Sequence, residues 1–146
     1  MSTYKTIVVG TDGSKSSLLA VERAAGIASA FGAKLIIGVA YYENEDQAAK
    51  TLRKDSIQVM GDHPAHDILN EAKAAADAVG ATDVQTVIQP GTPVEALMTI
   101  VTDNDADLLV VGNRGINTLT GRLVGSVPAD VARQSECDVM IVHTVQ

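Results

Sequence analysis

The chain alternates between short runs rich in apolar residues and longer stretches with helical periodicity, and this alternation limits the folds open to it. Apolar strands that alternate with helices indicate a parallel sheet with helices covering both faces. Because crossovers between parallel strands are right-handed, the expected fold is a doubly wound α/β domain with a five-stranded parallel sheet. The expected strands are Thr6–Gly10, Leu35–Ala40, Val84–Gln89, Leu108–Val111 and Val139–His143.

Helices are expected between consecutive strands, and local signals mark several of their ends. Thr92 is placed to cap a helix whose first residue is Pro93, and Glu95 completes a capping box. Gly32 follows another helical stretch, as glycine often does at helix ends. The polar stretch Tyr41–Asp62 fits either a partly helical or a mobile segment. The expected helices are Ser14–Phe31, Ala65–Val79, Thr92–Asn104 and Ser126–Gln134.

The composition fits one globular domain and excludes several classes of protein. The chain has 146 residues, and 18 acidic against 11 basic side chains give it a net charge of −7. That sign argues against nonspecific binding to nucleic acid or to an anionic membrane. The longest apolar run, near Leu108–Val111, is far shorter than the ~20 residues that cross a bilayer. A single cysteine, Cys137, excludes an internal disulfide and suits a reducing compartment. We therefore expect a single cytoplasmic domain over residues 1–146.

Two glycine-containing loops follow the first and the fourth expected strands. They are Thr11–Ser14 and Gly112–Gly115, and Gly125–Ser126 opens the last expected helix. In a doubly wound sheet, ligands bind beyond the carboxyl ends of the strands, where the strand order reverses. The N-terminus of a helix favours an anion, here a phosphate, and Arg114 and Arg122 add positive charge. The alternative is a flexible loop in which the serine is an ordinary N-cap.

Asp12 has two interpretations, and the histidines and other reactive side chains give weaker signals. The Asp12 carboxylate could accept hydrogen bonds from a ribose hydroxyl or an adenine amine, or it could instead cap the first helix or shape a turn. His63 and His66 are spaced to share one helix face, but no third metal ligand is obvious, so no metal site is predicted. The sequence has no recognisable nucleophile motif and no phosphate-binding lysine motif, so no catalytic residue is predicted.

The segment Ile7–Ser14 and the spacing of the later glycines together resemble the signatures of a known family. Gly112, Gly115, Gly125 and Ser126 follow the pattern G-x2-G-x9-G-[ST] of the ATP-binding subgroup of single-domain universal stress proteins. The similarity extends over nearly the whole chain. It implies a Rossmann-like sheet of order 3-2-1-4-5, like that of the adenine nucleotide alpha hydrolases. It also implies a nucleotide-binding regulator in stress physiology, usually a homodimer, with at most slow ATP hydrolysis.

The same resemblance implies a set of residues that contact an adenine nucleotide at the carboxyl ends of strands one and four. Those expected to hold the adenine and ribose are Thr11, Asp12, Val39 and Ala40. Those expected to meet the phosphates are Gly112, Arg114, Gly115, Gly125, Ser126 and Val127. The neighbouring residues that complete the predicted site are Gly10, Gly13, Asn113, Arg122 and Pro128.

One departure from the family pattern bears on the identity of the ligand. Members that bind ATP often have Ser or Thr two residues after the Gly125–Ser126 pair, where this chain has Pro128. Proline removes a backbone donor and a hydroxyl from the expected phosphate site. Some family members that resemble this chain prefer cyclic AMP. ATP, with Mg²⁺, and cAMP are therefore both candidate ligands, and AMP and ADP are possible. A ligand-independent interaction module and a slow ATPase are the alternative functions.

The last expected strand gives a separate reason to expect a homodimer. Its apolar residues are Val139, Met140, Ile141 and Val142, and the implied order puts the strand at an edge of the sheet. An apolar edge strand tends to pair with another chain, and a two-fold dimer would pair this strand with its own copy. The alternative is that Tyr41–Asp62 or the C-terminal tail covers this edge.

Overall fold

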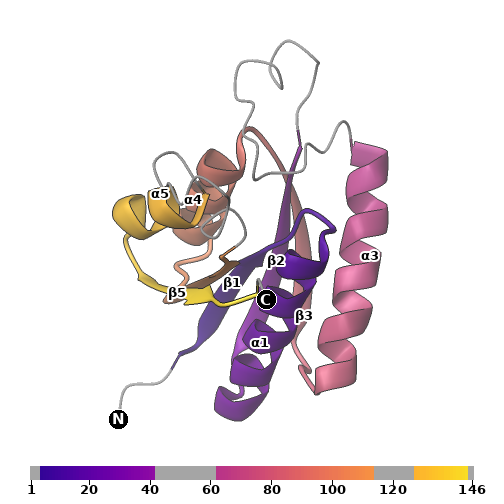
Figure 1. The fold of residues 1–146 in the computed structure, drawn as a ribbon. Helices are drawn as coiled ribbons and strands as arrows, with labels where there is room; N and C mark the ends of the chain where they lie inside the picture. The colour runs from indigo at the N-terminus through magenta and orange to yellow at the C-terminus, as the bar shows by residue number, and fades with distance from the viewer. Residues whose placement is uncertain (1–3, 42–61, 114–126, 145–146) are drawn as a thin grey trace.

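A computed structural model describes residues 4–41, 62–113 and 127–144, and in these ranges helices and strands alternate (Figure 1). The strands are β1 Thr6–Gly10, β2 Lys34–Tyr41, β3 Val84–Pro90, β4 Leu108–Gly112 and β5 Asp138–Val142. The helices are α1 Lys15–Phe31, α3 Asp62–Val79, α4 Pro93–Asp103 and α5 Val127–Gln134. The order of strands and helices confirms the prediction from the sequence.

The strands form one five-stranded sheet in the order β3-β2-β1-β4-β5, and all neighbouring strands are parallel. The expected architecture and strand order are therefore confirmed. From β1 the chain steps outward to β2 and β3 on one side, and β4 and β5 lie on the other side. The strand order reverses between β1 and β4, which pair directly from Ile7 with Leu108 to Val9 with Val110. A sheet of this kind has its crevice at the carboxyl ends of these two strands.

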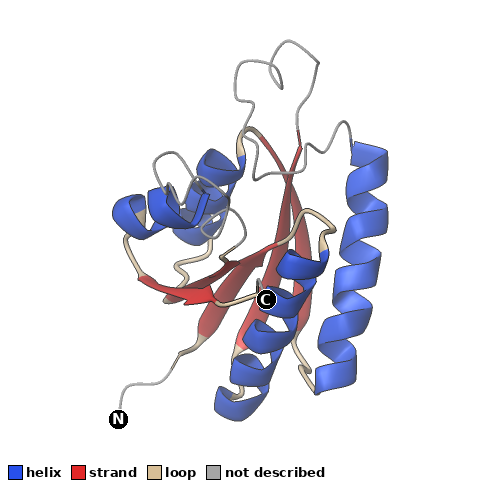
Figure 2. Ribbon diagram, viewed as in Figure 1, coloured by secondary structure: helices blue, strands red, loops and turns tan. Residues whose placement is uncertain are grey.

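Two layers of helices cover the sheet, as Figure 2 shows. Helices α1 and α3 pack on one face, and α4 and α5 pack on the other. Alternate residues of each central strand serve the two faces, so Ile7 and Val9 belong to the α1 side while Val8 belongs to the α4 side. All three are fully buried, which explains why a continuous apolar run was needed here.

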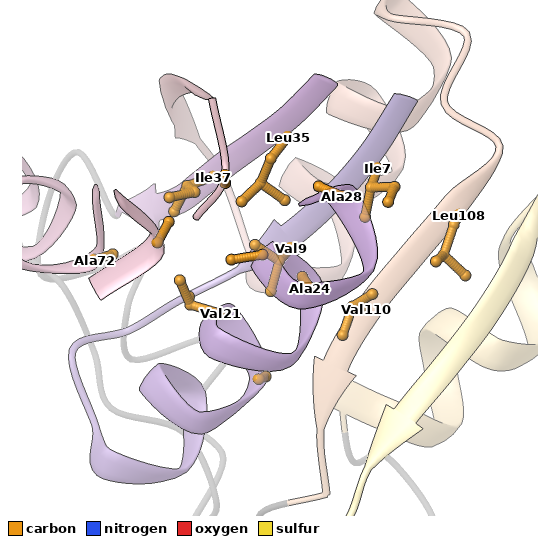
Figure 3. Packing of buried hydrophobic residues seen from close by; sticks show 14 of the residues in the cluster. Ile7, Val9, Val21, Ala24, Ala28, Leu35, Ile37, Ala72, Leu108 and Val110 are labelled. Atoms are coloured by element: carbon orange, nitrogen blue, oxygen red, sulfur yellow. The ribbon is translucent and has the colours of Figure 1, made fainter. Parts of the chain in front are cut away.

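Helix α1 lies close to the centre of the sheet because its inner face carries small side chains. In Figure 3, Ala24 of α1 lies between Val9 of β1 and Val110 of β4, and Ala28 of α1 lies beside Ile7 of β1. The helix begins after the N-cap Ser14, whose side chain accepts a hydrogen bond from the Ser17 N–H, and ends at Gly32 in the left-handed conformation (φ 66°).

The capping box predicted for α4 is present. The Thr92 side chain accepts from the Glu95 N–H, and the Glu95 carboxylate accepts from the Thr92 N–H. This fixes the start of α4 just past the carboxyl end of β3. No helix in the described ranges is both long and apolar enough to span a membrane.

Gly38 in β2 permits the close packing of α4 on the sheet, and a substitution at this position tests that packing. A Cβ at Gly38 would lie 2.6 Å from Cδ1 of Ile100, a buried side chain of α4. We predict that Gly38→Ala lowers the free energy of unfolding by about 1–3 kcal/mol through overpacking, measured by urea denaturation.

The matched control is Gly26→Ala in α1. A Cβ there meets only Val79 Cγ1, at an ordinary 3.9 Å, so the better helix propensity of alanine should leave the protein equally stable or more stable by up to about 1 kcal/mol. If Gly38→Ala and Gly26→Ala lower the free energy of unfolding equally, packing of α4 does not require a glycine at position 38.

Candidate functional site

The carboxyl ends of β1 and β2 are held together where β1 passes into its loop. The N–H of Thr11 donates to the carbonyl of Gly38 at 2.9 Å, which extends the parallel pairing by one residue. This bond places the Thr11 turn beside Val39 and Ala40, the residues expected to line the same site. Thr11 is only 6% exposed, so its hydroxyl needs partners within the protein.

The hydroxyl of Ser17, in the first turns of α1, organises the turn after β1. Its oxygen lies 3.0 Å from the Ser14 carbonyl, 3.3 Å from the Asp12 N–H nitrogen and 2.9 Å from Thr11 Oγ1. A carbonyl only accepts and an amide N–H only donates, so Ser17 gives its single proton to Ser14 and accepts from Asp12. The remaining bond must then run from the Thr11 hydroxyl to Ser17.

This direction of donation has a consequence for Thr11. Its proton is committed to Ser17, and its oxygen also accepts from the Gly13 N–H at 3.2 Å. Any further group that approaches Thr11 Oγ1 must therefore donate a hydrogen bond. Ribose hydroxyls and the adenine amine have the required donors.

Asp12 shapes the same turn. Its Oδ1 accepts from the Ser14 N–H at 2.9 Å, a local bond typical of an aspartate that orders a turn before a helix. The interpretation that Asp12 shapes a turn is thus confirmed, the interpretation that it caps the helix is wrong, and its role toward a ligand stays a prediction. Ser14, not Asp12, is the N-cap of α1.

The end of β4 approaches the first turn of α1, and Gly112 makes this approach possible. A Cβ at Gly112 would lie 3.0 Å from Ser16 Oγ and 3.3 Å from the Ser16 carbonyl oxygen. Gly10 at the end of β1 has a similar reason to be glycine, because its Cβ would lie 2.9 Å from Leu97 Cδ2 of α4. Packing within the protein therefore accounts for both glycines, independently of any ligand.

Asn113 directly follows β4 and is almost fully buried, with 5% of its surface exposed. Its backbone N–H donates to the Val142 carbonyl at 2.9 Å. Its side-chain oxygen accepts from the backbone N–H and the hydroxyl of Thr144, at 2.7 and 2.9 Å. Its side-chain nitrogen lies 3.0 Å from Nδ1 of His143. The side chain thus joins the ends of β4 and β5.

Helix α5 begins at Val127 and carries a buried carboxylate in its first turn. Asp130 is 4% exposed and forms an ion pair with Arg133 at 2.8 Å. Pro128 is buried in the same turn. A carboxylate in the first turn of a helix interacts favourably with the positive end of the helix dipole.

The structure brings the predicted site residues of β1, β2, β4 and the residues directly after them to one edge of the sheet, and Val127 and Pro128 open α5. Gly10–Gly13, Val39–Ala40 and Gly112–Asn113 all lie at the carboxyl ends of neighbouring strands. Five further predicted residues lie outside the described residues: Arg114, Gly115, Arg122, Gly125 and Ser126. Within the described ranges, no group of three or more His, Cys, Asp or Glu side chains could hold a metal ion.

Sequence reasoning missed the side chains that support these loops, namely Ser16, Ser17 and Thr144. Ser17 lies three residues after the N-cap, a position at which a serine hydroxyl often bonds back to the preceding turn, so that signal was available. The partnership of Ser16 with Thr144 joins residues 128 positions apart and has no local signal.

The class of protein follows from comparison with known sequences. The family model described as "Universal stress protein family" matches residues 3–143, so the chain belongs to this family.

Sequence and structural similarity to other universal stress proteins supports the same assignment. The chain is 53% identical to universal stress protein Rv1636 of Mycobacterium tuberculosis, with 99% of each chain covered. It is 49% identical to a universal stress protein whose crystal structure was solved in complex with cAMP, with a TM-score of 0.82 and coverage of 99% of this chain and 100% of the other. A universal stress protein of Archaeoglobus fulgidus in complex with dAMP shares the fold at 19% identity, with a TM-score of 0.70 and coverage of 97% and 99%.

The arrangement around Ser17 leads to a prediction. Ser17→Ala removes the group that accepts from the Asp12 N–H and the Thr11 hydroxyl. We expect the free energy of unfolding to fall by about 1 kcal/mol and hydrogen exchange of the Asp12 amide to accelerate. Urea denaturation and amide exchange followed by NMR measure the two effects.

Ser29→Ala is the control, because Ser29 is exposed on the same helix and the change in helix propensity is the same. It should change stability by less than about 0.5 kcal/mol. If the Asp12 amide exchanges equally slowly in wild type and Ser17→Ala, Ser17 does not order the turn.

Proposed function

We propose that this protein is an adenine-nucleotide-binding regulator whose preferred ligand is cAMP. One observation carries the proposal: a universal stress protein 49% identical over 99% of this chain was solved in complex with cAMP, and its fold matches with a TM-score of 0.82. At this level of identity, a ligand site made largely of backbone and small residues is expected to be retained.

The geometry of the described residues supports a site for a nucleoside at this edge. The strand order reverses between β1 and β4, and their carboxyl ends lie side by side. On the β1 side, Thr11 offers only hydrogen-bond acceptance, which suits the hydroxyl and amine donors of adenosine. Val39 and Ala40 at the end of β2 would border the adenine, and Asp12 would accept from the ribose.

The backbone at the start of α5 favours a ligand with one negative charge. The phosphate would meet Gly112, Arg114, Gly115, Gly125, Ser126 and Val127. Pro128 has no N–H, so the first turn of α5 has one donor fewer for a phosphate chain. A cyclic monophosphate carries a single charge and needs fewer donors than a triphosphate, so this feature supports cAMP over ATP.

Calorimetric titration of nucleotide-free protein with cAMP and with ATP, each with and without Mg²⁺, tests the proposal. An extract of denatured protein should first be analysed for nucleotide that co-purifies. We expect cAMP to bind at least about tenfold more tightly than ATP, a difference of about 1.4 kcal/mol. Tighter binding of ATP would contradict the preference, and binding of neither nucleotide would reject the function and favour a ligand-independent interaction module.

Pro128→Ser tests the explanation for the preference. The substitution restores an N–H and a hydroxyl at the start of α5, so the affinity for ATP should rise about tenfold while that for cAMP changes less than about twofold. Pro93→Ser, at the first turn of α4, is the matched control and should leave both affinities unchanged. An equal gain for both nucleotides would show that Pro128 does not select between them.

We also propose that the protein forms a two-fold dimer through β5. This strand is the last in the sheet order and pairs with β4 on one side only among the described strands. Ile141, near its end, is 41% exposed, although Val142 beside it is buried. An apolar edge strand of this kind can pair antiparallel with its own copy.

Ile141→Lys should therefore convert the dimer to a monomer, as measured by sedimentation equilibrium, because a charge on the edge strand opposes pairing. Val79→Lys is the control. Val79 is similarly exposed, at 43%, but lies at the end of α3, which packs over β2 and β3 on the other half of the sheet. A dimer that persists in Ile141→Lys and dissociates in Val79→Lys would place the interface elsewhere.

A further inference from the structure

The ends of β4, β5 and α1 are joined by a chain of polar side chains that the ligand contacts proposed above do not include. Ser16 Oγ bonds to Thr144 Oγ1, and Thr144 bonds through both its hydroxyl and its N–H to Asn113 Oδ1. Asn113 Nδ2 continues to His143 Nδ1 at 3.0 Å. We define Ser16, Asn113, His143 and Thr144 as the terminal polar cluster.

The direction of each hydrogen bond in this cluster follows from the backbone. The Thr144 N–H can only donate, so the Asn113 atom 2.7 Å from it must be the carbonyl oxygen. The amide nitrogen of Asn113 therefore faces His143, and Nδ1 of that ring must accept. Since the Thr144 hydroxyl donates to Asn113, it receives its own bond from Ser16. The donors thus run from Ser16 to Thr144 to Asn113 to His143.

The buried amide of Asn113 is the residue on which this cluster converges. Asn113 is 5% exposed, and its oxygen already accepts two hydrogen bonds from Thr144. Its own N–H continues the pairing of β4 with β5 by bonding to the Val142 carbonyl. Both its backbone and its side chain are therefore fixed by β5 and the residues directly after it.

The position of Asn113 in the chain gives this arrangement its functional meaning. It is the last residue before the segment 114–126, which carries Gly115, Gly125 and Ser126 of the glycine pattern. Gly112 directly precedes Asn113 and lies close to Ser16. A Cβ at position 112 would force the neighbouring Ser16 atoms to move. The cluster therefore fixes Asn113, the residue from which the chain continues into that segment.

From this geometry we infer that Asn113 is a positioning residue for nucleotide binding and acts through Thr144, not by contact with the ligand. The inference rests on the proposed function and adds to it a supporting pair that lies outside the glycine pattern. It revises the role expected for Asn113 from the sequence, where it was one of the residues that line the site. It also assigns a role to Thr144, which follows the last strand.

Substitutions on both sides of the Asn113–Thr144 contact separate positioning from direct contact. Asn113→Ala should weaken cAMP binding about tenfold in calorimetry. Thr144→Val keeps the branched shape but removes the hydroxyl, and should weaken binding about three- to tenfold although Asn113 is unchanged. Thr144→Ser retains the hydroxyl and should bind within about twofold of wild type. In the double variant Asn113→Ala/Thr144→Val, the loss of cAMP affinity should be smaller than the product of the two single losses, because both substitutions remove the same contact.

A control variant separates positioning from general loss of stability. Asn104→Ala removes another side-chain amide bond, from Asn104 Nδ2 to the Ile100 carbonyl at 2.8 Å, at the end of α4 and near the amino end of β4. Its unfolding midpoint in urea should fall by an amount similar to that of Asn113→Ala, while its affinity for cAMP stays within about twofold of wild type. Equal losses of affinity in the two variants would overturn the inference.

Amide hydrogen exchange in the ligand-free protein gives a measurement that does not depend on nucleotide. In Asn113→Ala the Thr144 amide loses its acceptor, so its exchange should accelerate at least about tenfold relative to wild type. Unchanged exchange would overturn the inference. If the wild-type protein binds neither cAMP nor ATP, both the proposed function and this inference are rejected. Wild-type binding of cAMP that Asn113→Ala and Thr144→Val leave intact would overturn the inference alone.

Discussion

The structure depends on the two-sided pairing of β1. This strand is hydrogen-bonded in parallel to β2 on one side and to β4 on the other, and its residues Ile7, Val8 and Val9 have no exposed surface. Parallel strands need crossover connections, and these supply the helices that cover both faces. The strand order reverses beside β1, so the same pairing that buries the core also sets the switch point at whose carboxyl edge sheets of this kind bind ligands.

Close packing then determines which residues can stand at that edge. Alanines on α1 let the helix approach the sheet. Glycines at the ends of β1 and β4 and in the middle of β2 leave space for Leu97, Ser16 and Ile100, respectively. The glycines that look like ligand-binding positions in the sequence therefore have a second reason to be glycine. Two serines of α1 form hydrogen bonds at this edge: Ser17 with the turn after β1, and Ser16 with Thr144 after β5.

Much of the fold was predictable because its signals are local. The apolar run Thr6–Gly10, the capping box at Thr92 and the stop at Gly32 each depend on a few adjacent residues. The strand order came from the family resemblance, since hydrophobic patterns do not say which strands are neighbours. In the site, the Thr11–Gly13 turn was recognised, but the hydroxyl of Ser17 that orders it was not. Whether β5 pairs with another chain is a question of surface exposure, which the sequence did not give.

The sequence alone determined the α/β class, the element order, the family and the segments that we propose carry the site, because periodicity, capping and glycine spacing are properties of neighbouring residues. Only the tertiary structure decided what each polar side chain does. Asn113 and Thr144 are 31 positions apart, and Ser16 is 128 positions from Thr144. Their hydrogen bonds exist because pairing of β4 with β5 and packing of α1 bring three chain segments to one place, and a buried amide there must find its partners among them.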